Sequence, residues 1–184
     1  MAELIAAWHV EHLNFARLLD VLEGEVALFR EAGDPDFGCM RDVVAYLCEY
    51  PDRFHHPREN AAFARLVVRD PGLRLPINRL LQEHRAIAVA GEELLERLNE
   101  SIGGESADRA GVEAAAAIYL AYYRHHLGHE EREILPRAAQ LLTPQDWAMV
   151  AAAIAPGADP LFAGLPDPRY RSLSARLMHA SRAR

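Results

Sequence analysis

The sequence predicts an all-α fold, an up-down-up-down antiparallel four-helix bundle with a C-terminal helical extension. Apolar residues recur at helical spacing through four long segments, and breakers rich in glycine and proline separate those segments. No segment has the strict alternation of apolar and polar residues that is typical of a strand. Because the connections are short, successive helices are expected to be antiparallel neighbours. We expect the bundle at residues 1–141 and the extension, packed on the bundle, at residues 142–184.

The first two helices are bounded by strong breakers. The first is expected over about residues 2–32, before Gly33-Asp34-Pro35. The second is expected from the region of Gly38 to Arg69, where Asp70-Pro71-Gly72 stops it. Both segments are long enough to span the full height of a bundle.

The third and fourth helices have equally clear ends. The third is expected over about residues 74–101, with Pro76 in its opening turn, where a missing N–H costs least, and Gly103-Gly104 after it. The fourth is expected to begin after Asp108 and to continue to about residue 140.

The last forty or so residues are expected to be mostly helical as well. Thr143 followed by Pro144 is a good helix start, and this short helix should reach about residue 155. The Pro- and Gly-rich segment 156–168 contains apolar residues and should wrap against the bundle as an ordered segment. A final helix is expected over about residues 168–182.

Composition and charge exclude several classes of protein. The formal net charge of -7 argues against nucleic acid or an anionic membrane surface as a partner, because no broad cationic surface is available. No apolar run is long enough for a membrane span, and no cationic leader precedes the first helix, so we expect a cytoplasmic protein. The two cysteines, Cys39 and Cys48, lie about 13 Å apart on opposite helix faces and should not form a disulfide. The C-terminal helices are candidate surfaces for a homodimer.

The positions of the nine histidines carry the functional information. Two carboxylates follow a histidine by four residues, His55 with Glu59 and His126 with Glu130, and residues at that spacing project from one helix face. The spacing alone is weak evidence in a chain rich in both residues. Depth in the bundle is better evidence: the four helices place one histidine each, roughly 10–14 residues from the same end, in a layer about 6 Å thick. Those histidines are His12, His55, His84 and His126.

The two halves of the chain repeat this arrangement. Glu11-His12 is matched by Glu83-His84, and the His55/Glu59 pair is matched by His126/Glu130. Four imidazoles and two carboxylates inside a bundle suit two ions of the iron or manganese type, because all-oxygen sites favour Mg²⁺ or Ca²⁺ and thiolate sites favour Zn²⁺ or iron–sulfur clusters. The chain has no Glu-x-x-His pair, which the ferritin-like di-iron site requires. Residue 133 is glutamate where the zinc-protease motif needs its second histidine.

At this point the chain resembles a known family, the hemerythrin-like HHE cation-binding domains. The resemblance covers about residues 5–137 and rests on the order H, H-x3-E, H, H-x3-E, with the local sequences WHVEHLNFARLL, YPDRFHHPRENAAF, EHRAI and HHLGHEEREILP. It implies a non-haem centre of two iron ions, bridged by carboxylates and an oxo or hydroxo group, that reacts with O2, H2O2 or NO. The metal ligands that it implies are His12, His55, Glu59, His84, His126 and Glu130.

The chain departs from the oxygen-carrying hemerythrins on the third helix. Those carriers have a second histidine one turn before the residue that corresponds to His84, and here that position is Leu80. The missing ligand favours redox turnover or sensing over reversible oxygen carriage. Candidates to replace it, as further ligands or outer partners, are His9, His56, His129 and Glu133. His125 is expected to face outward, and Tyr122, together with Glu133, is a candidate hydrogen-bond partner for a bound oxygen ligand.

Three functions follow from these patterns. The first is oxygen or iron sensing or storage at the di-iron centre, and the second is a di-iron enzyme with catalase-like turnover of peroxide. The third is a helical interaction scaffold in which the metal is only structural. The sequence leaves open whether the protein is an enzyme.

Pro57 lies beside the ligands of the second helix. It lacks the N–H that would bond to the carbonyl of Arg53, and it disfavours α geometry at His56. We therefore expect a kink or bulge there that sets the angle between His55, His56 and Glu59.

Overall fold

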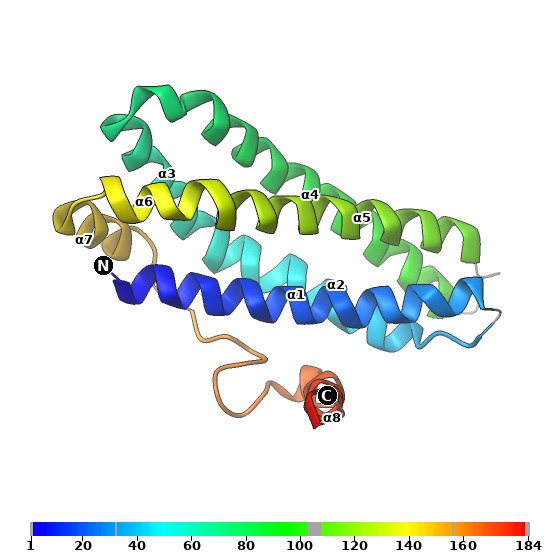
Figure 1. The fold of residues 1–184 in the computed structure, drawn as a ribbon. Helices are drawn as coiled ribbons and strands as arrows, with labels where there is room; N and C mark the ends of the chain where they lie inside the picture. The colour runs from blue at the N-terminus through cyan, green and yellow to red at the C-terminus, as the bar shows by residue number, and fades with distance from the viewer. Residues whose placement is uncertain (1, 32, 103–107, 156, 183–184) are drawn as a thin grey trace.

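The computed structural model describes residues 2–31, 33–102, 108–155 and 157–182, and all regular structure within these ranges is helical. The long helices lie side by side (Figure 1). α1 packs against both α2 and α5, and α4 packs against the same two helices. The elements that form these long helices are α1 (Ala2–Arg30), α2 (Phe37–Tyr50), α3 (His56–Arg69), α4 (Arg74–Ile102), α5 (Arg109–His129) and α6 (Leu135–Leu141).

Aspartate side chains cap the starts of two of these helices. Asp36 accepts a hydrogen bond from the N–H of Cys39 at the start of α2, and Asp108 accepts one from the N–H of Gly111 at the start of α5. These bonds satisfy amide groups that would otherwise lack a partner in the first turn. α1 ends at Arg30, two residues before the predicted end at residue 32, which lies outside the described residues. The expected break at Gly103-Gly104 also lies outside them.

Two of the long helices contain a π-helical turn. One turn, Pro51–His55, joins α2 to α3, and the other, Glu130–Ile134, joins α5 to α6. In each, an N–H donates to the carbonyl five residues earlier: His56 to Pro51, and Leu135 to Glu130. Such turns are rare and occur mostly at functional sites.

The first π turn is the distortion that the sequence predicts beside Pro57. Next to the proline, the carbonyl of Phe54 accepts a hydrogen bond from Nε of Arg58 at 2.8 Å. Both His55 and His56 are buried after this turn, although they are consecutive residues. The second π turn was not predicted.

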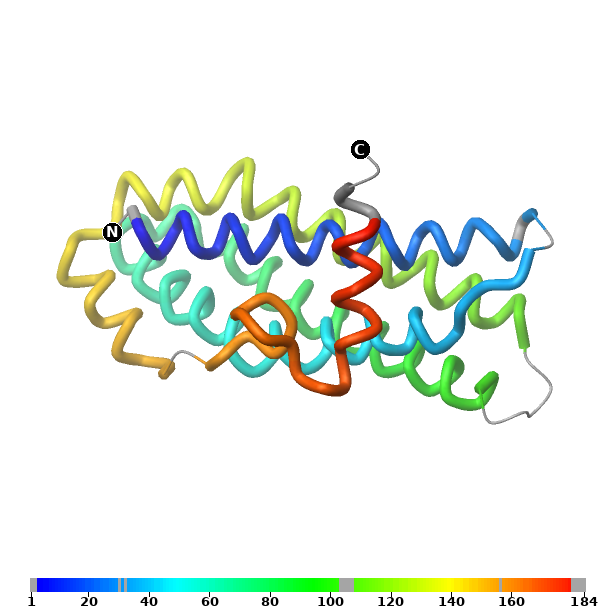
Figure 2. Tube along the Cα trace, turned by 90° about the horizontal axis from the view of Figure 1, so that it is seen from below, coloured from blue at the N-terminus to red at the C-terminus, as the bar shows by residue number. Residues whose placement is uncertain are grey.

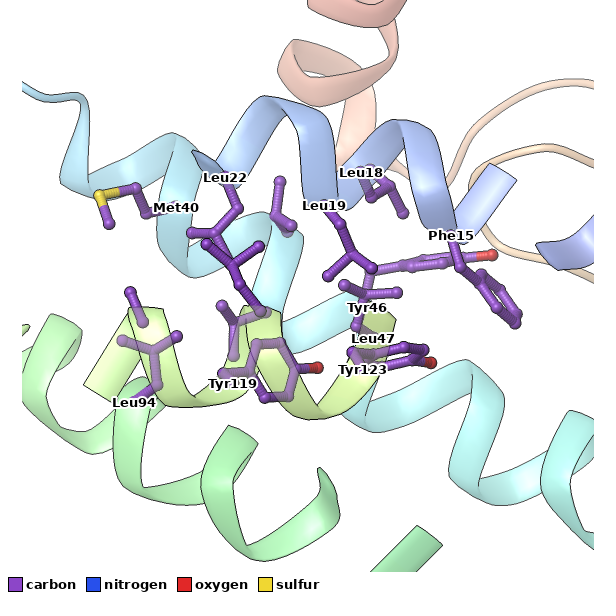
Figure 3. Close-up of a cluster of buried hydrophobic side chains, with 14 of the residues drawn as sticks. Phe15, Leu18, Leu19, Leu22, Met40, Tyr46, Leu47, Leu94, Tyr119 and Tyr123 are labelled. Atoms are coloured by element: carbon purple, nitrogen blue, oxygen red, sulfur yellow. The ribbon is translucent and has the colours of Figure 1, made fainter. Parts of the chain in front are cut away.

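The hydrophobic core consists of two clusters with a polar layer between them. The first cluster includes Phe15, Leu47, Leu94 and Tyr119, and Figure 3 shows these side chains meeting from α1, α2, α4 and α5. A close approach of α4 to this cluster requires Gly91, because a Cβ there would lie 2.5 Å from Sγ of Cys48. The second cluster lies toward the other end of the long helices and contains Trp8, Phe63, Leu80 and Trp147.

Two further helices follow the long ones. α7 (Pro144–Ala153) begins with a capping box formed by Thr143 and Asp146. The buried Asp146 carboxylate also accepts hydrogen bonds from Arg65 and Arg69 of α3, which anchors α7 to the bundle. Its neighbour Trp147 packs against Trp8 with ring centroids 5.8 Å apart.

The segment after α7 contacts the first cluster, and residue 156 lies outside the described ranges. Leu161 is buried in the first cluster, and the Tyr46 hydroxyl donates to Asp159 at 3.0 Å. A 3₁₀ turn (Pro168–Tyr170) then leads into α8 (Arg171–Arg182), which runs across the long helices (Figure 2). Arg176 of α8 pairs with the buried Glu25 of α1.

Within the described ranges, none of the helices combines the length and the apolar character that crossing a lipid bilayer requires. Both cysteines are free, as predicted. Cys39 is buried, and Cys48 is partly buried against the first cluster.

We predict that Pro57→Ala changes the metal content of the protein. Alanine restores the missing N–H and allows an ordinary α turn, which would alter the angle between His55, His56 and Glu59. Metal analysis and the absorption spectrum of the reconstituted variant measure this change, with Pro76→Ala, in the first turn of α4, as the control. A Pro57→Ala protein with unaltered metal content and spectrum would show that the distortion does not depend on proline or does not matter to the site.

Candidate metal centre

Seven ionisable side chains converge in the polar layer between the two hydrophobic clusters. Every one of them is at most 8% exposed. They come from each long helix, so the layer ties together segments that are far apart in the sequence. The seven residues are His12 on α1, His55 in the first π turn, His56 and Glu59 on α3, His84 on α4, His126 on α5 and Glu130 in the second π turn.

The carboxylate of Glu59 lies between histidines of different helices. Its Oε1 is 3.1 Å from Nε2 of His55 and 3.3 Å from Nε2 of His12. Its Oε2 is 3.7 Å from Nε2 of His84. The two oxygens therefore face two different groups of imidazoles, which is the position of a bridging carboxylate.

Glu130 occupies a matching position. Its Oε2 is 3.2 Å from Nε2 of His126 and 3.6 Å from Nε2 of His12. Its Oε1 is 3.6 Å from Nε2 of His84. A second carboxylate thus lies between the same groups of histidines.

The donor atoms fall into two sets that share Glu59. Within each set the atoms lie within 4.8 Å of one another. Two metal–ligand bonds of about 2.0–2.2 Å at 90–110° place their ligand atoms roughly 3.0–3.5 Å apart, so the observed separations suit cations held between the side chains. The first set is His12, His55 and Glu59, and the second is His56, Glu59, His84 and His126.

Each of the five histidines of the layer has a hydrogen-bond partner at its Nδ1 atom. Nδ1 of His55 lies 2.6 Å from Glu11, Nδ1 of His12 lies 2.7 Å from Glu131, and Nδ1 of His56 lies 2.8 Å from Asp52. The other two pairs are His84 with Asn60, at 3.1 Å, and His126 with Glu83, at 3.3 Å. Because a carboxylate or amide oxygen only accepts, each Nδ1 donates, and Nε2 faces the centre of the layer. This outer set of partners is typical of metal-binding histidines.

Several buried polar atoms at the centre of the layer have no hydrogen-bond partner. They are both carboxylate oxygens of Glu59, both of Glu130, and Nε2 of His84 and of His126. Leaving such atoms buried and unpaired costs free energy, and a bound cation removes that cost. The residues present therefore fit metal ions.

The internal repeat of the sequence explains the outer partners. Within each half, the glutamate that precedes a histidine serves the histidine of the next helix: Glu11 holds His55, and Glu83 holds His126. The residue after each central glutamate serves the opposite half. Glu131, after Glu130, holds His12, and Asn60, after Glu59, holds His84.

The two halves of the layer differ in charge. Burial lowers the pKa of His12, but its hydrogen bond with Glu131 and its contact with the carboxylate of Glu59 outweigh burial and raise the pKa to about 10. His84 faces the neutral Asn60, and burial lowers its pKa. Burial also lowers the pKa of His56 well below the usual value, and the neighbouring His84 and His55 add to this shift.

The central carboxylates also differ from each other. Burial, together with the charge of Glu59, raises the pKa of Glu130 to about 7. Burial opposes ionisation of Glu59 as well, but the charge of His55 and the close contacts with His12 and His55 hold its pKa well below the usual range. Nε2 of His12 lies 2.9 Å from Nε2 of His55, so without a metal a proton on His12 occupies this space.

The structure brings together all six residues that the resemblance implied, and it adds His56 from the candidates for a further ligand. His9 is 54% exposed and contacts Glu131 at 3.0 Å, so it stands behind His12 and outside the layer. His129 lies outside the layer, between Glu83 of α4 and Glu133. Leu80 is buried in the second hydrophobic cluster.

The sequence did not predict several residues in or beside the layer. Tyr122 is half exposed, which removes it as a partner for a ligand in the layer, whereas Tyr123 is fully buried and its hydroxyl has no partner. The ring of Tyr123 lies 6.4 Å from that of His56. The roles of Glu11 and Glu83 were also missed, although the repeated Glu-His dipeptide was a visible signal of them.

We predict that His56→Ala lowers the amount of metal that the protein retains, because the set with His84 and His126 loses a nitrogen donor. Affinity for one ion should fall at least 10-fold, the loss typical for even an outer partner. Metal content after reconstitution with Fe(II) and dialysis measures it. His179→Ala, an exposed histidine of α8, is the control and should retain the wild-type content, and an equal content in both variants would exclude His56 as a ligand.

We also predict that metal uptake at pH 7 releases protons and that affinity falls on acidification. His12, with a pKa of about 10, is protonated at pH 7 and must lose its Nε2 proton to bind a metal. Below pH 7, Glu130 gains a proton as well. A pH indicator in weak buffer measures the release when Fe(II) is added anaerobically, and an unchanged pH would contradict the ligand role of His12.

The comparisons with known proteins agree with this geometry. No curated protein and no solved structure matches the chain significantly. The family described as the hemerythrin HHE cation binding domain matches residues 3–138, which include all seven residues of the layer. The chain therefore belongs to the hemerythrin HHE cation-binding domain family, and its cluster of histidines and glutamates is able to bind metal.

Proposed function

We propose that the protein binds two iron ions in the buried layer and that this centre binds O2 or a related small ligand, such as peroxide or nitric oxide, for sensing or storage. One observation carries the proposal: five imidazoles and two carboxylates converge in a buried layer, and every imidazole is held at Nδ1 by an outer partner. Neither set of donors in the described residues contains a thiolate, and mixed nitrogen and oxygen donors suit iron or manganese.

The residues divide naturally between two ions. His12 and His55 would hold one ion, and His56, His84 and His126 would hold the other. Glu59 would bridge the two, because its Oε1 faces His12 and its Oε2 faces His84. Glu130 would lie between them as well, with its Oε2 near both His126 and His12 and its Oε1 near His84. His56 would supply the nitrogen donor that Leu80 cannot.

When bound, a pair of iron ions supplies reversible one-electron redox steps and an open position for a small ligand. The side of His12 and His55 has fewer protein donors, so the open position is expected there. Phe15 packs edge-on against His55 at a centroid distance of 5.0 Å, which helps to keep water out of this side.

A proton path leads from the surface to the same side. The exposed His9 contacts Oε2 of Glu131 at 3.0 Å, and Oε1 of Glu131 accepts from Nδ1 of His12 at 2.7 Å. Glu131 can therefore pass a proton between His9 and Nδ1 of His12. This path favours a second candidate function, catalase-like turnover of peroxide, because the reduction of one peroxide to water takes up two protons and the oxidation of a second peroxide to O2 releases two.

The proposal includes the wider architecture expected from the sequence. The alternating directions of α1, α2 with α3, α4, and α5 with α6, which the colours of Figure 1 show, support an up-down-up-down bundle over residues 1–141. The contacts of α7 with α3 and of α8 with α2 support an extension over residues 142–184 that packs on it. The cytoplasmic location and the homodimer stay predictions.

We predict that protein reconstituted anaerobically with Fe(II) holds about two irons per chain. After exposure to O2 it should show the near-ultraviolet and visible charge-transfer bands of a bridged di-iron centre. The double variant Glu59→Gln, Glu130→Gln should lose both iron and bands while keeping its helical content. Stable uptake of zinc without iron, or no uptake of any metal, would contradict the proposal.

The same preparation separates the two candidate functions. A spectrum that reverses on evacuation of the gas favours binding, whereas rapid peroxide consumption that is lost in His126→Ala favours turnover. If turnover uses the path through Glu131, His9→Ala should slow it without changing the iron content.

A further inference from the structure

A third group of potential ligands lies outside the buried layer, on the face where α4 and α5 meet. It consists of Glu83, His125 and His129, whose donor atoms lie within 4.8 Å of one another. None of the three belongs to either set in the layer. From its place in the sequence, His125 is expected only to face outward, and His129 is a candidate further ligand of the buried centre.

The geometry of this group is that of an open metal site. Nε2 of His125 and Nδ1 of His129 each lie 3.7 Å from Oε1 of Glu83. These distances are too long for hydrogen bonds, and they are close to the roughly 3.0–3.5 Å that separates two ligands of one ion. A contraction of a few tenths of an ångström would complete the site.

His129 points to a missing partner. The residue is only 8% exposed, and its buried Nδ1 has no hydrogen-bond partner. Its other nitrogen, Nε2, lies on the side of Glu133, at 3.8 Å from the carboxylate. The unpaired nitrogen is therefore the one that faces Glu83 and His125.

The site is accessible from solvent. His125 is 65% exposed and lies one helical turn before His129, so both rings project from one face of α5. A hollow of about 260 Å³ adjoins it, lined by Arg79, Gln82, Glu83, Ala86, Tyr122 and His125. Water from this hollow can complete the coordination of an ion held by three side chains.

We propose that Glu83, His125 and His129 bind one divalent transition-metal ion, and that ions reach the buried centre from this surface site. Two imidazoles and one carboxylate are a donor set for Zn²⁺ or Fe²⁺. Oε1 of Glu83 faces this site, and its Oε2 accepts a hydrogen bond from Nδ1 of His126 at 3.3 Å. The side chain of Glu83 therefore links the surface site to the buried layer. The binding site stands alone, whereas its loading role rests on the function proposed above.

Binding is tested by titrating Zn²⁺ into protein whose buried centre already holds iron. One further ion per chain is expected for the wild type and for the control His179→Ala, an exposed histidine on α8. His125→Ala should remove that ion, and because this side chain is largely exposed, the variant should fold normally. Holoprotein that takes up no further ion, or a His125→Ala protein that still takes it up, would overturn the site.

Loading is tested by the rate at which metal-free protein acquires the spectrum of the filled centre after Fe²⁺ is added. His125→Ala should slow this rate several-fold and leave the final iron content of the buried centre unchanged. An unchanged rate, with the surface ion lost, would overturn the loading role.

The double variant Glu59→Gln, Glu130→Gln separates this inference from the proposed function. If the buried centre of the wild type binds no iron, the proposed function fails. The surface site is then judged in the double variant, which should still bind one Zn²⁺ per chain, and no binding there would overturn it.

Discussion

The fold depends on a buried layer of charge that the polypeptide alone does not satisfy. Glu59 and Glu130 have no exposed surface and no hydrogen-bond partner for any of their four carboxylate oxygens. Burying a carboxylate without hydrogen bonds costs several kcal/mol, which is a large part of the roughly 5–15 kcal/mol that holds an ordinary domain together. Because this layer separates the two hydrophobic clusters, cations in it would complete the core and would couple metal binding to folding.

The layer is built twice from one short pattern. Each half of the chain supplies a Glu-His pair on one helix and a His-x3-Glu on the next, and the residues beside these ligands hold the imidazoles in place. The two halves differ in the residues that hold the first histidine of each half. His12 is held by the carboxylate Glu131, whereas His84 is held by the amide of Asn60. The position that corresponds to His56 in the second half is Leu127, so the fifth histidine has no counterpart.

The sequence predicted the helices and six of the seven residues of the layer, because helical periodicity and i, i+4 spacing report directly on which side chains share a face. It did not decide whether His56 faces inward. Next to His55 in a regular helix it would point about 100° away, and only the π turn brings both rings into the layer. The second π turn ends two residues before Pro136, as the first ends two residues before Pro57, so the same signal was present and was missed. Choosing between Tyr122 and Tyr123 likewise required the rotation of α5, which depends on packing against the neighbouring helices.

The proposed function requires cations in the space between Glu59 and Glu130. The most direct measurement is anomalous X-ray diffraction at the iron absorption edge from crystals of the iron-reconstituted protein. Two iron peaks are expected in the layer, one beside His12 and His55 and the other beside His56, His84 and His126, with both carboxylates between them. A single peak, or none among these residues, would contradict it.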